Sequence, residues 1–252
     1  MKLHIKKSGT GPPLVILHGL FGSLDNWFSI GKELLDHYTL YLVDQRNHGD
    51  SPHSAEWNYG VMVEDLCELL DGEGLDSVYL MGHSMGGKTV MNFAVRYPDR
   101  VRKLIVGDIA PGYYPIHHQL ILEGLNALNL QTLQSRKEAD EQLANSIPEV
   151  GIRQFLLKSL SRDANGFAWK INLPVITQHI EEVGKALDKE TVFEGPTLFL
   201  GGANSSYIQE KDLPDMKRHF PNCTWISIPN AGHWLHAEQP QAVVAEMRRF
   251  LG

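Results

Sequence analysis

The sequence predicts an α/β fold with a mostly parallel, doubly wound sheet and an inserted helical cap. Short apolar runs alternate with amphipathic helical patterns up to residue 111 and again over residues 190–252, whereas residues 112–189 keep only the helical patterns. Alternating strands and helices are typical of a parallel sheet covered on both faces, with functional loops at the carboxyl ends of its strands. We therefore expect a core domain of residues 1–111 and 190–252 and a cap of residues 112–189.

The expected strands are continuous apolar runs, as in strands that are buried on both faces. They occupy residues 13–17, 39–43, 77–81, 103–107, 196–200 and 224–228. Helical patterns, with apolar residues three or four positions apart, separate them. We place these helices at residues 25–35, 59–70, 210–219 and 239–251 and directly after Ser84.

Two signals support helices in the cap segment. Residues 135–138 read SRKE, which fits a capping box, and Pro148 and Pro174 stand where the first turn of a helix accepts proline. We expect the cap to cover the strand ends, because segments inserted between the carboxyl ends of strands usually form lids. A helical decoration elsewhere on the surface is the alternative.

Charge and composition exclude several classes of protein. The chain has 252 residues, a net charge of −7, a pI near 5.9 and no Lys/Arg cluster, so it lacks the basic face that non-specific nucleic-acid binding needs. It shows no signal peptide and no apolar run of the roughly 18 residues that a membrane span needs. We therefore expect a soluble, cytoplasmic protein. Cys67 and Cys223 lack metal-ligand spacing, which predicts free, buried thiols.

Residues 82–86 read GHSMG and lie between an apolar run and a helical pattern. A G-x-S-x-G at a strand-to-helix turn is a nucleophile elbow, whose glycines leave room for a strained turn that exposes the serine hydroxyl. The amino end of the following helix faces developing negative charge. We therefore expect Ser84 to be a nucleophile. A chance match in a glycine-bearing turn is the alternative.

A serine nucleophile needs a base that takes its proton and an acid that orients the base. The candidate base is His233, because it directly follows the last expected strand in residues 230–234, which read NAGHW. His236 is the second candidate. Four other histidines have ordinary structural contexts, which are polar and surface-like for His37, His53 and His219 and a cap helix for His179.

The candidate acid is Asp108, which ends the strand after the elbow helix in the sequence GDIAP. The place after the strand at residues 196–200, where an acid is common in this pattern, reads GGAN and offers only Asn204. An asparagine carries no charge to stabilise the imidazolium. A turn-capping role is the alternative for Asp108. Asp44 also ends a strand, but the turn-rich residues after it favour a loop-bracing role.

Residues 18–22 read HGLFG, follow the first long apolar strand and supply a loop for an oxyanion. We expect the backbone N–H groups of Leu20 and Met85 to hold the charge that develops on the reacting carbonyl. A glycine-rich turn without a ligand is the alternative. Lys88 lies one helical turn after Ser84. A solvated or ion-paired lysine is favoured there over one that contacts anionic substrate groups, such as the phosphates of a coenzyme A ester.

Together these motifs resemble the serine esterases of the α/β-hydrolase superfamily over essentially the whole chain. The matching residues are 18–22, 44–49, 82–88, 108–111 and 231–234, and they resemble the YbfF-type esterase branch. Members of that branch are esterases or thioesterases with a helical cap and an aspartate after the sixth strand, which fits Asp108 and Asn204. The resemblance implies short- to medium-chain acyl esters or acyl thioesters as substrates.

The sequence thus predicts a serine hydrolase that cleaves small-molecule carboxylic esters or thioesters through an acyl-enzyme and requires no cofactor or metal. The serine at position 84 disfavours haloalkane dehalogenases and epoxide hydrolases, which need an aspartate there. The alternatives are a binding protein or receptor on the same scaffold, an acyltransferase or perhydrolase, and a carbon–carbon bond hydrolase.

Overall fold

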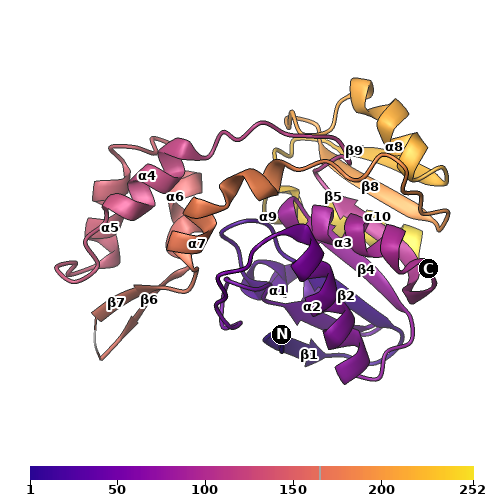
Figure 1. The fold of residues 1–252 in the computed structure, drawn as a ribbon, viewed down its shortest axis with the longest axis horizontal. Coiled ribbons are helices and arrows are strands. Elements are labelled where there is room, and N and C mark those ends of the chain that lie inside the picture. Colours follow the sequence, from indigo (N-terminus) through magenta and orange to yellow (C-terminus); the bar gives the residue numbers. More distant parts are fainter. Residues whose placement is uncertain (165) are drawn as a thin grey trace.

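The computed structural model describes residues 1–164 and 166–252 and contains a seven-stranded sheet, which lies in the right half of Figure 1. In spatial order the strands are β1 (Ile5–Ser8), β3 (Thr39–Val43), β2 (Pro13–Leu17), β4 (Val78–His83), β5 (Val101–Gly107), β8 (Thr197–Gly202) and β9 (Cys223–Ile228). All neighbours are parallel except β1, which pairs antiparallel with β3. The predicted fold class is therefore confirmed.

Helices cover both faces of the sheet because successive residues of each strand point to opposite faces. In β2, Val15 and Leu17 pack into one apolar cluster, and Leu14 and Ile16 pack into the other. The first cluster contains residues of α2 (Tyr59–Gly72), α3 (Met85–Arg96) and α8 (Leu213–His219). The second contains residues of α1 (Phe28–Lys32), α9 (Leu235–Glu238) and α10 (Pro240–Leu251). The sheet domain also has the short 3₁₀ turns η1 (Leu24–Trp27), η2 (Pro98–Arg100) and η4 (Glu210–Asp212).

Helix α2 shows why the sequence pattern predicts its element well. The Asn58 side chain accepts a hydrogen bond from the Val61 amide at 3.0 Å and so caps the amino end. Val63, Leu66 and Leu70 are buried against the sheet, as their helical spacing predicts. The helix therefore follows from one cap and one apolar stripe.

Between β5 and β8 the chain leaves the sheet and forms a separate group of short elements, drawn at the left of Figure 1. These are α4 (Gln119–Ala127), α5 (Arg136–Leu143), α6 (Val150–Leu157), β6 (Leu160–Asp163), β7 (Gly166–Trp169), α7 (Leu173–Gln178) and η3 (Ile180–Gly184). Ser135 caps α5 by accepting from the Glu138 amide at 3.1 Å, and Pro174 lies in the first turn of α7. Pro148, in contrast, lies before α6 and not in its first turn.

The antiparallel hairpin of β6 and β7 corrects the expectation that residues 112–189 contain only helices. Each of its strands has four residues, and they pair only with each other. Such short, partly exposed strands need no continuous apolar run, which is the pattern that predicts strands of the central sheet. The edge strand β1 also lacks this pattern, since Lys6 and Lys7 interrupt it, and the sequence did not predict it.

The segment 112–189 packs on the sheet domain near the carboxyl ends of β2 and β4. Its apolar cluster includes Leu20 and Met85, which follow these two strands. Polar contacts fix a second side, where Lys170 Nζ lies 2.8 Å from an Asp50 carboxylate oxygen and Asn172 Nδ2 donates to Asn47 Oδ1 at 3.0 Å. The segment is thus joined to the core by both apolar and polar contacts.

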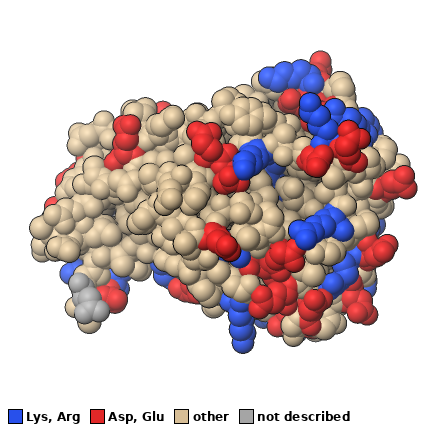
Figure 2. All heavy atoms as spheres, viewed as in Figure 1, with Lys and Arg blue, Asp and Glu red and all other residues tan. Residues whose placement is uncertain are grey.

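Three further sequence expectations can be compared with the structure. Both cysteines are free, with Cys223 buried and Cys67 only half-buried. His219 is buried and not on the surface, because the last turn of α8 directs its Nδ1 to the Thr191 carbonyl at 2.7 Å. Among the described helices, none has the length and apolar character to cross a membrane. On the face shown in Figure 2, basic and acidic side chains are interspersed over the core.

Candidate active site

Ser84 stands alone between β4 and α3 in a strained turn. Its φ of 53° and ψ of −118° lie outside the regions that a residue with a side chain prefers. A Cβ added at Gly82 would lie 2.1 Å from the Gly86 carbonyl oxygen, and one added at Gly86 would lie 2.5 Å from the His18 carbonyl oxygen. Only glycine fits at these two positions. The elbow that the motif predicts is therefore present.

The structure brings Ser84, His233 and Asp108 into one hydrogen-bonded chain. His233 Nε2 lies 3.1 Å from Ser84 Oγ, and His233 Nδ1 lies 2.7 Å from Asp108 Oδ2. Because a carboxylate only accepts, Nδ1 carries the proton and Nε2 is left free to accept from the serine hydroxyl. Asp108 is fully buried, whereas the His233 side chain is 20% exposed. This is the geometry of a nucleophile, a base and an orienting acid.

Two groups from the loop after β8 complete the surroundings of Asp108. The Gly202 amide donates to Oδ1 at 3.0 Å, and the Ser205 hydroxyl donates to Oδ2. Asn204, which lies between them in sequence, has an exposed side chain, and its amide donates to the Ala231 carbonyl. The loop that offers Asn204 therefore supports the carboxylate of Asp108 through its neighbours.

His236 lies near the catalytic candidates, but its environment differs from that of His233. Its ring is buried and stacks on Trp27 with a centroid distance of 4.6 Å. Burial lowers the pKa of His236 well below its usual value. It therefore lines one side of the site.

Two residues that the sequence analysis missed hold His233 in place. The Tyr207 ring stacks on the His233 ring at 4.0 Å with an interplanar angle of 20°. His83 Nε2 donates to the His233 carbonyl at 2.7 Å. His83 stands inside the G-x-S-x-G motif, so its position was visible, but its partner is 150 residues away. Nothing in the sequence around Tyr207 signals a stacking role.

The candidate oxyanion loop approaches the elbow closely. A Cβ at Gly19 would lie 3.2 Å from Ser84 Cβ, so the loop backbone passes directly beside the nucleophile. Met85 is the first residue of α3, and the first N–H groups of a helix have no acceptor within it. Leu20 and Met85 line a cavity together with Ser84. Both residues therefore border the nucleophile, and the oxyanion role of their amides stays a prediction.

Two buried histidines brace this loop. His18 Nε2 accepts from the Gln45 amide at 3.0 Å, and His48 Nε2 accepts from the Phe21 amide at 3.2 Å. Each ring therefore donates through Nδ1, His18 to the Gly19 carbonyl and His48 to the Arg46 carbonyl. Burial lowers the pKa of His18 to about 4 and that of His48 to about 3. Both rings are neutral acceptors at neutral pH.

Because His18 and His48 are buried in the neutral form, we expect the free energy of unfolding to fall in mild acid. In the unfolded chain their pKa is near 6.5, so below that pH the unfolded state binds protons that the folded state excludes. Their contribution is complete above pH 6.5 and is lost toward pH 3 to 4, at about 1.4 kcal/mol per pH unit for each histidine. Guanidinium unfolding at pH 7, 6 and 5 measures the slope. His48→Gln should reduce this slope by the contribution of one proton.

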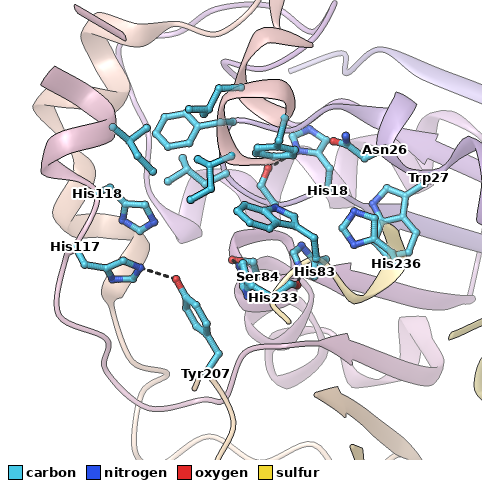
Figure 3. A pocket seen from close by; sticks show the side chains of 18 residues that line it. His18, Asn26, Trp27, His83, Ser84, His117, His118, Tyr207, His233 and His236 are labelled. Atoms are coloured by element: carbon cyan, nitrogen blue, oxygen red, sulfur yellow. Dashed lines mark hydrogen bonds between the residues drawn. The ribbon is translucent and has the colours of Figure 1, made fainter. Parts of the chain in front are cut away.

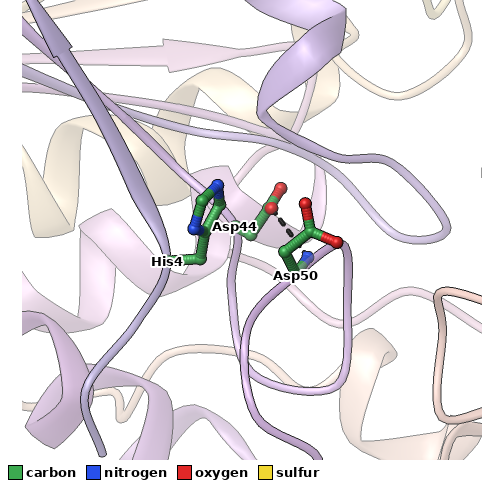
Figure 4. A group of neighbouring side chains, drawn as sticks. All are labelled: His4, Asp44 and Asp50. Carbon is green, nitrogen blue, oxygen red and sulfur yellow. Dashed lines mark hydrogen bonds between the residues drawn. The ribbon is translucent and has the colours of Figure 1, made fainter.

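Asp44 braces the loops on both sides of it, after β2 and after β3, which agrees with the loop-bracing role that the sequence favoured. Its Oδ1 accepts from the Leu24 amide at 2.7 Å and its Oδ2 from the Asp50 amide at 2.9 Å. His4, Asp44 and Asp50 lie close together, with one potential ligand atom from each within 4.8 Å of the others (Figure 4). Because Asp44 already accepts two backbone hydrogen bonds and Asp50 pairs with Lys170, we assign this group to loop bracing.

Lys88 contradicts both expectations for it. Its ammonium is buried away from solvent and substrate, and it forms no ion pair within residues 1–164 and 166–252. Its side chain is fully buried, and Nζ donates to the carbonyls of Pro111, at 2.8 Å, and Gly112. Nζ also lies 5.2 Å from the centre of the Tyr114 ring. Burial lowers the pKa of Lys88 to about 7. The lysine therefore ties the elbow helix to the chain that leads from Asp108 into the segment 112–189.

Replacing Lys88 by methionine is expected to lower the free energy of unfolding by about 1–3 kcal/mol, because two carbonyls lose their donor. It should also lower kcat/KM, because the same stretch carries Asp108. Lys103→Met is a matched control, since Lys103 Nζ donates to the Phe250 and Leu251 carbonyls at the carboxyl end of the chain. The control should lose stability and keep its kcat/KM. Equal kinetics for both variants would contradict the link to Asp108.

A cavity of about 200 Å³ opens above Ser84 between the sheet domain and the segment 112–189. Figure 3 shows Ser84 and His233 at its base, His117 and His118 on one side, and Trp27 and His236 on the other. The remaining walls are largely apolar, from Leu20, Phe21, Ile121, Ile152, Phe155, Leu156 and Trp234. A concave apolar site with a few convergent polar groups is typical of a small-molecule pocket.

The sheet order, the elbow and the hydrogen-bonded chain at its tip define an α/β hydrolase. Residues 12–120 match the family model of the alpha/beta hydrolase fold. The chain is 41% identical over 96% of its length to the sn-1-specific diacylglycerol lipase ABHD11 of Mus musculus, covering 81% of that protein. It therefore belongs to the α/β-hydrolase family, among its esterases and lipases.

Two more comparisons cover nearly the whole chain. The chain is 38% identical to the esterase YbfF of Escherichia coli, across 100% of this chain and 99% of that one. It is also similar to the solved structure of a marine microorganism esterase, with a TM-score of 0.97, 43% identity and 99% of each chain covered. The predicted resemblance to α/β-hydrolase esterases is thereby confirmed.

Proposed function

We propose that the protein is a serine hydrolase that cleaves carboxylic esters or acyl thioesters through a Ser84–His233–Asp108 triad and an acyl-enzyme. The hydrogen-bonded chain from Ser84 Oγ through His233 to Asp108, at the base of a cavity, carries this proposal. It is the arrangement that makes a serine hydroxyl nucleophilic. The esterase relatives support the same chemistry.

The mechanism has two halves. Ser84 Oγ attacks the carbonyl carbon while His233 Nε2 takes the hydroxyl proton, and the Leu20 and Met85 amides donate to the oxyanion. His233 then gives that proton to the leaving oxygen or sulfur, and the acyl group remains on Ser84. In the second half water attacks the acyl-enzyme, His233 takes its proton, and the proton returns to Ser84 as the acid leaves.

We also propose that residues 112–189 act as a cap over this site. Residues from α4 and α6, including Ile121, Phe155 and Leu156, line the cavity above Ser84. A lid excludes water, which strengthens the hydrogen bonds that stabilise the transition state. The same lining makes acyl esters, and not highly charged compounds, the favoured substrates.

A fluorophosphonate probe tests the proposal. The probe phosphonylates a serine only when a base activates it, so the parent protein should be labelled and Ser84→Ala should not. Ser205→Ala is the matched control. Ser205 contacts Asp108 but should not react itself, so this variant should still be labelled. A parent protein that stays unlabelled would favour the binding-protein alternative.

A further inference from the structure

Ser84 lies where two cavities of very different size meet. The larger one has a volume of about 200 Å³, and the smaller one about 20 Å³. Both are lined by Leu20, Ser84, His117, His118 and Tyr207. An ester bound at Ser84 can therefore place its acyl half and its alcohol half in different cavities. The volumes of these two cavities differ about tenfold.

The triad geometry decides which half goes to which cavity. The leaving oxygen of the tetrahedral intermediate must face His233 Nε2, because that atom protonates it. The oxyanion faces the amides of Leu20 and Met85. The remaining substituent, the acyl chain, must then point away from His233.

The residues that line each cavity indicate which cavity lies next to His233. Among the described residues, His233 and Trp234 line the larger cavity only, whereas Met85 and Ile109 line the smaller cavity only. The base is therefore on the side of the large cavity. The start of the elbow helix is on the side of the small one.

We infer that the small cavity holds the acyl group and the large cavity the leaving group, so that the preferred substrates join a short acyl group to a bulky apolar alcohol or thiol. This rests on the proposed function and specifies its substrate class. A volume of about 20 Å³ is close to the roughly 10–15 Å³ that holds one water molecule, so it fits an acetyl or propionyl chain. The large cavity has room for an aromatic ring.

The walls of the small cavity are firmly packed. A Cβ at Gly184 would lie 2.1 Å from the Tyr114 carbonyl oxygen and 3.2 Å from Ile116 Cδ1. The extended segment 114–116 therefore packs directly against Gly184. Tyr114 is itself fixed, because its hydroxyl accepts from the Ala110 amide at 2.9 Å and donates to the Tyr207 carbonyl. Ile116 and Val183 therefore set the size of the acyl site.

Two isomeric esters test the inference. Phenethyl acetate and ethyl phenylacetate have the same formula and an unactivated alkyl leaving group, but the phenyl ring is on the alcohol in the first and on the acid in the second. We expect kcat/KM, measured by titration of the released acid, to be at least about 10-fold higher for phenethyl acetate, the discrimination that one misplaced methylene group already gives. Equal values, or a preference for ethyl phenylacetate, would overturn the inference.

Variants of each cavity give a second measurement. Ile116→Ala and Val183→Ala should raise kcat/KM for phenethyl butyrate relative to phenethyl acetate, because each enlarges the acyl site. Ile121→Ala, which widens only the large cavity, is the matched control and should leave that ratio unchanged. A ratio that shifts with Ile121→Ala and not with the other two would assign the cavities the other way.

The inference and the proposed function fail in different ways. Turnover of either isomer that disappears in Ser84→Ala supports the hydrolase whichever isomer is preferred, and the preference then decides the inference alone. Absence of turnover for every ester, together with an unlabelled Ser84, would overturn both.

Discussion

Replacing Ser84 by alanine is expected to lower kcat for p-nitrophenyl acetate by about 10⁶-fold, as loss of the nucleophile does in the serine protease subtilisin. The reason is that Ser84 is the proposed nucleophile, and two other nucleophilic groups near the site are already engaged. His236 is buried against Trp27, and the Ser205 hydroxyl donates to Asp108. The release of p-nitrophenol, followed over hours at high enzyme concentration, measures the residual rate.

The control for this variant is Ser205→Ala. It removes one hydrogen bond to Asp108 and leaves Ser84 and His233 in contact, so a much smaller loss is expected. Unchanged far-ultraviolet circular dichroism should accompany both variants. A Ser84→Ala protein within tenfold of the parental kcat would show that the hydrolysis proceeds at another residue.

Local patterns predicted much of the sheet domain, because its elements are strongly amphipathic or continuously apolar. The runs at β2, β3 and β4 are buried on both faces, so composition alone reveals them. The elbow was equally predictable, since the approach of Gly86 to the His18 carbonyl excludes any side chain there. In these places one local constraint determines the structure.

Features that depend on distant partners could not be predicted in this way. Lys88 is buried because two carbonyls, 23 and 24 residues further on, accept from it, and a lysine on a helix is ordinarily solvated. Tyr207 stacks on His233, and Ser205 donates to Asp108, only because the loop after β8 turns back toward β5. Short strands such as β6 pair through their backbones, which leave little trace in side-chain patterns.

Asp108→Asn is expected to lower kcat by about 10⁴-fold while binding of the substrate changes little, the effect that this replacement has in a serine protease triad. Asp108 is fully buried and serves only as an acceptor, from the Gly202 amide at Oδ1 and from Ser205 Oγ and His233 Nδ1 at Oδ2. An asparagine carboxamide has one oxygen, and Gly202 needs it. Its NH₂ group then faces His233.

That orientation inverts the tautomer of the base. Facing an NH₂ donor, His233 Nδ1 must accept, so the ring proton moves to Nε2, which then donates to Ser84 Oγ and cannot take its proton. The kcat for p-nitrophenyl acetate as a function of pH measures the loss. Asn204→Ala is the matched control and should keep near-parental turnover, because the Asn204 side chain is exposed. If Asp108→Asn kept near-parental turnover and Asn204→Ala were inactive, the assignment of Asp108 would be wrong, and the role of orienting His233 would belong to Asn204 in the loop after β8.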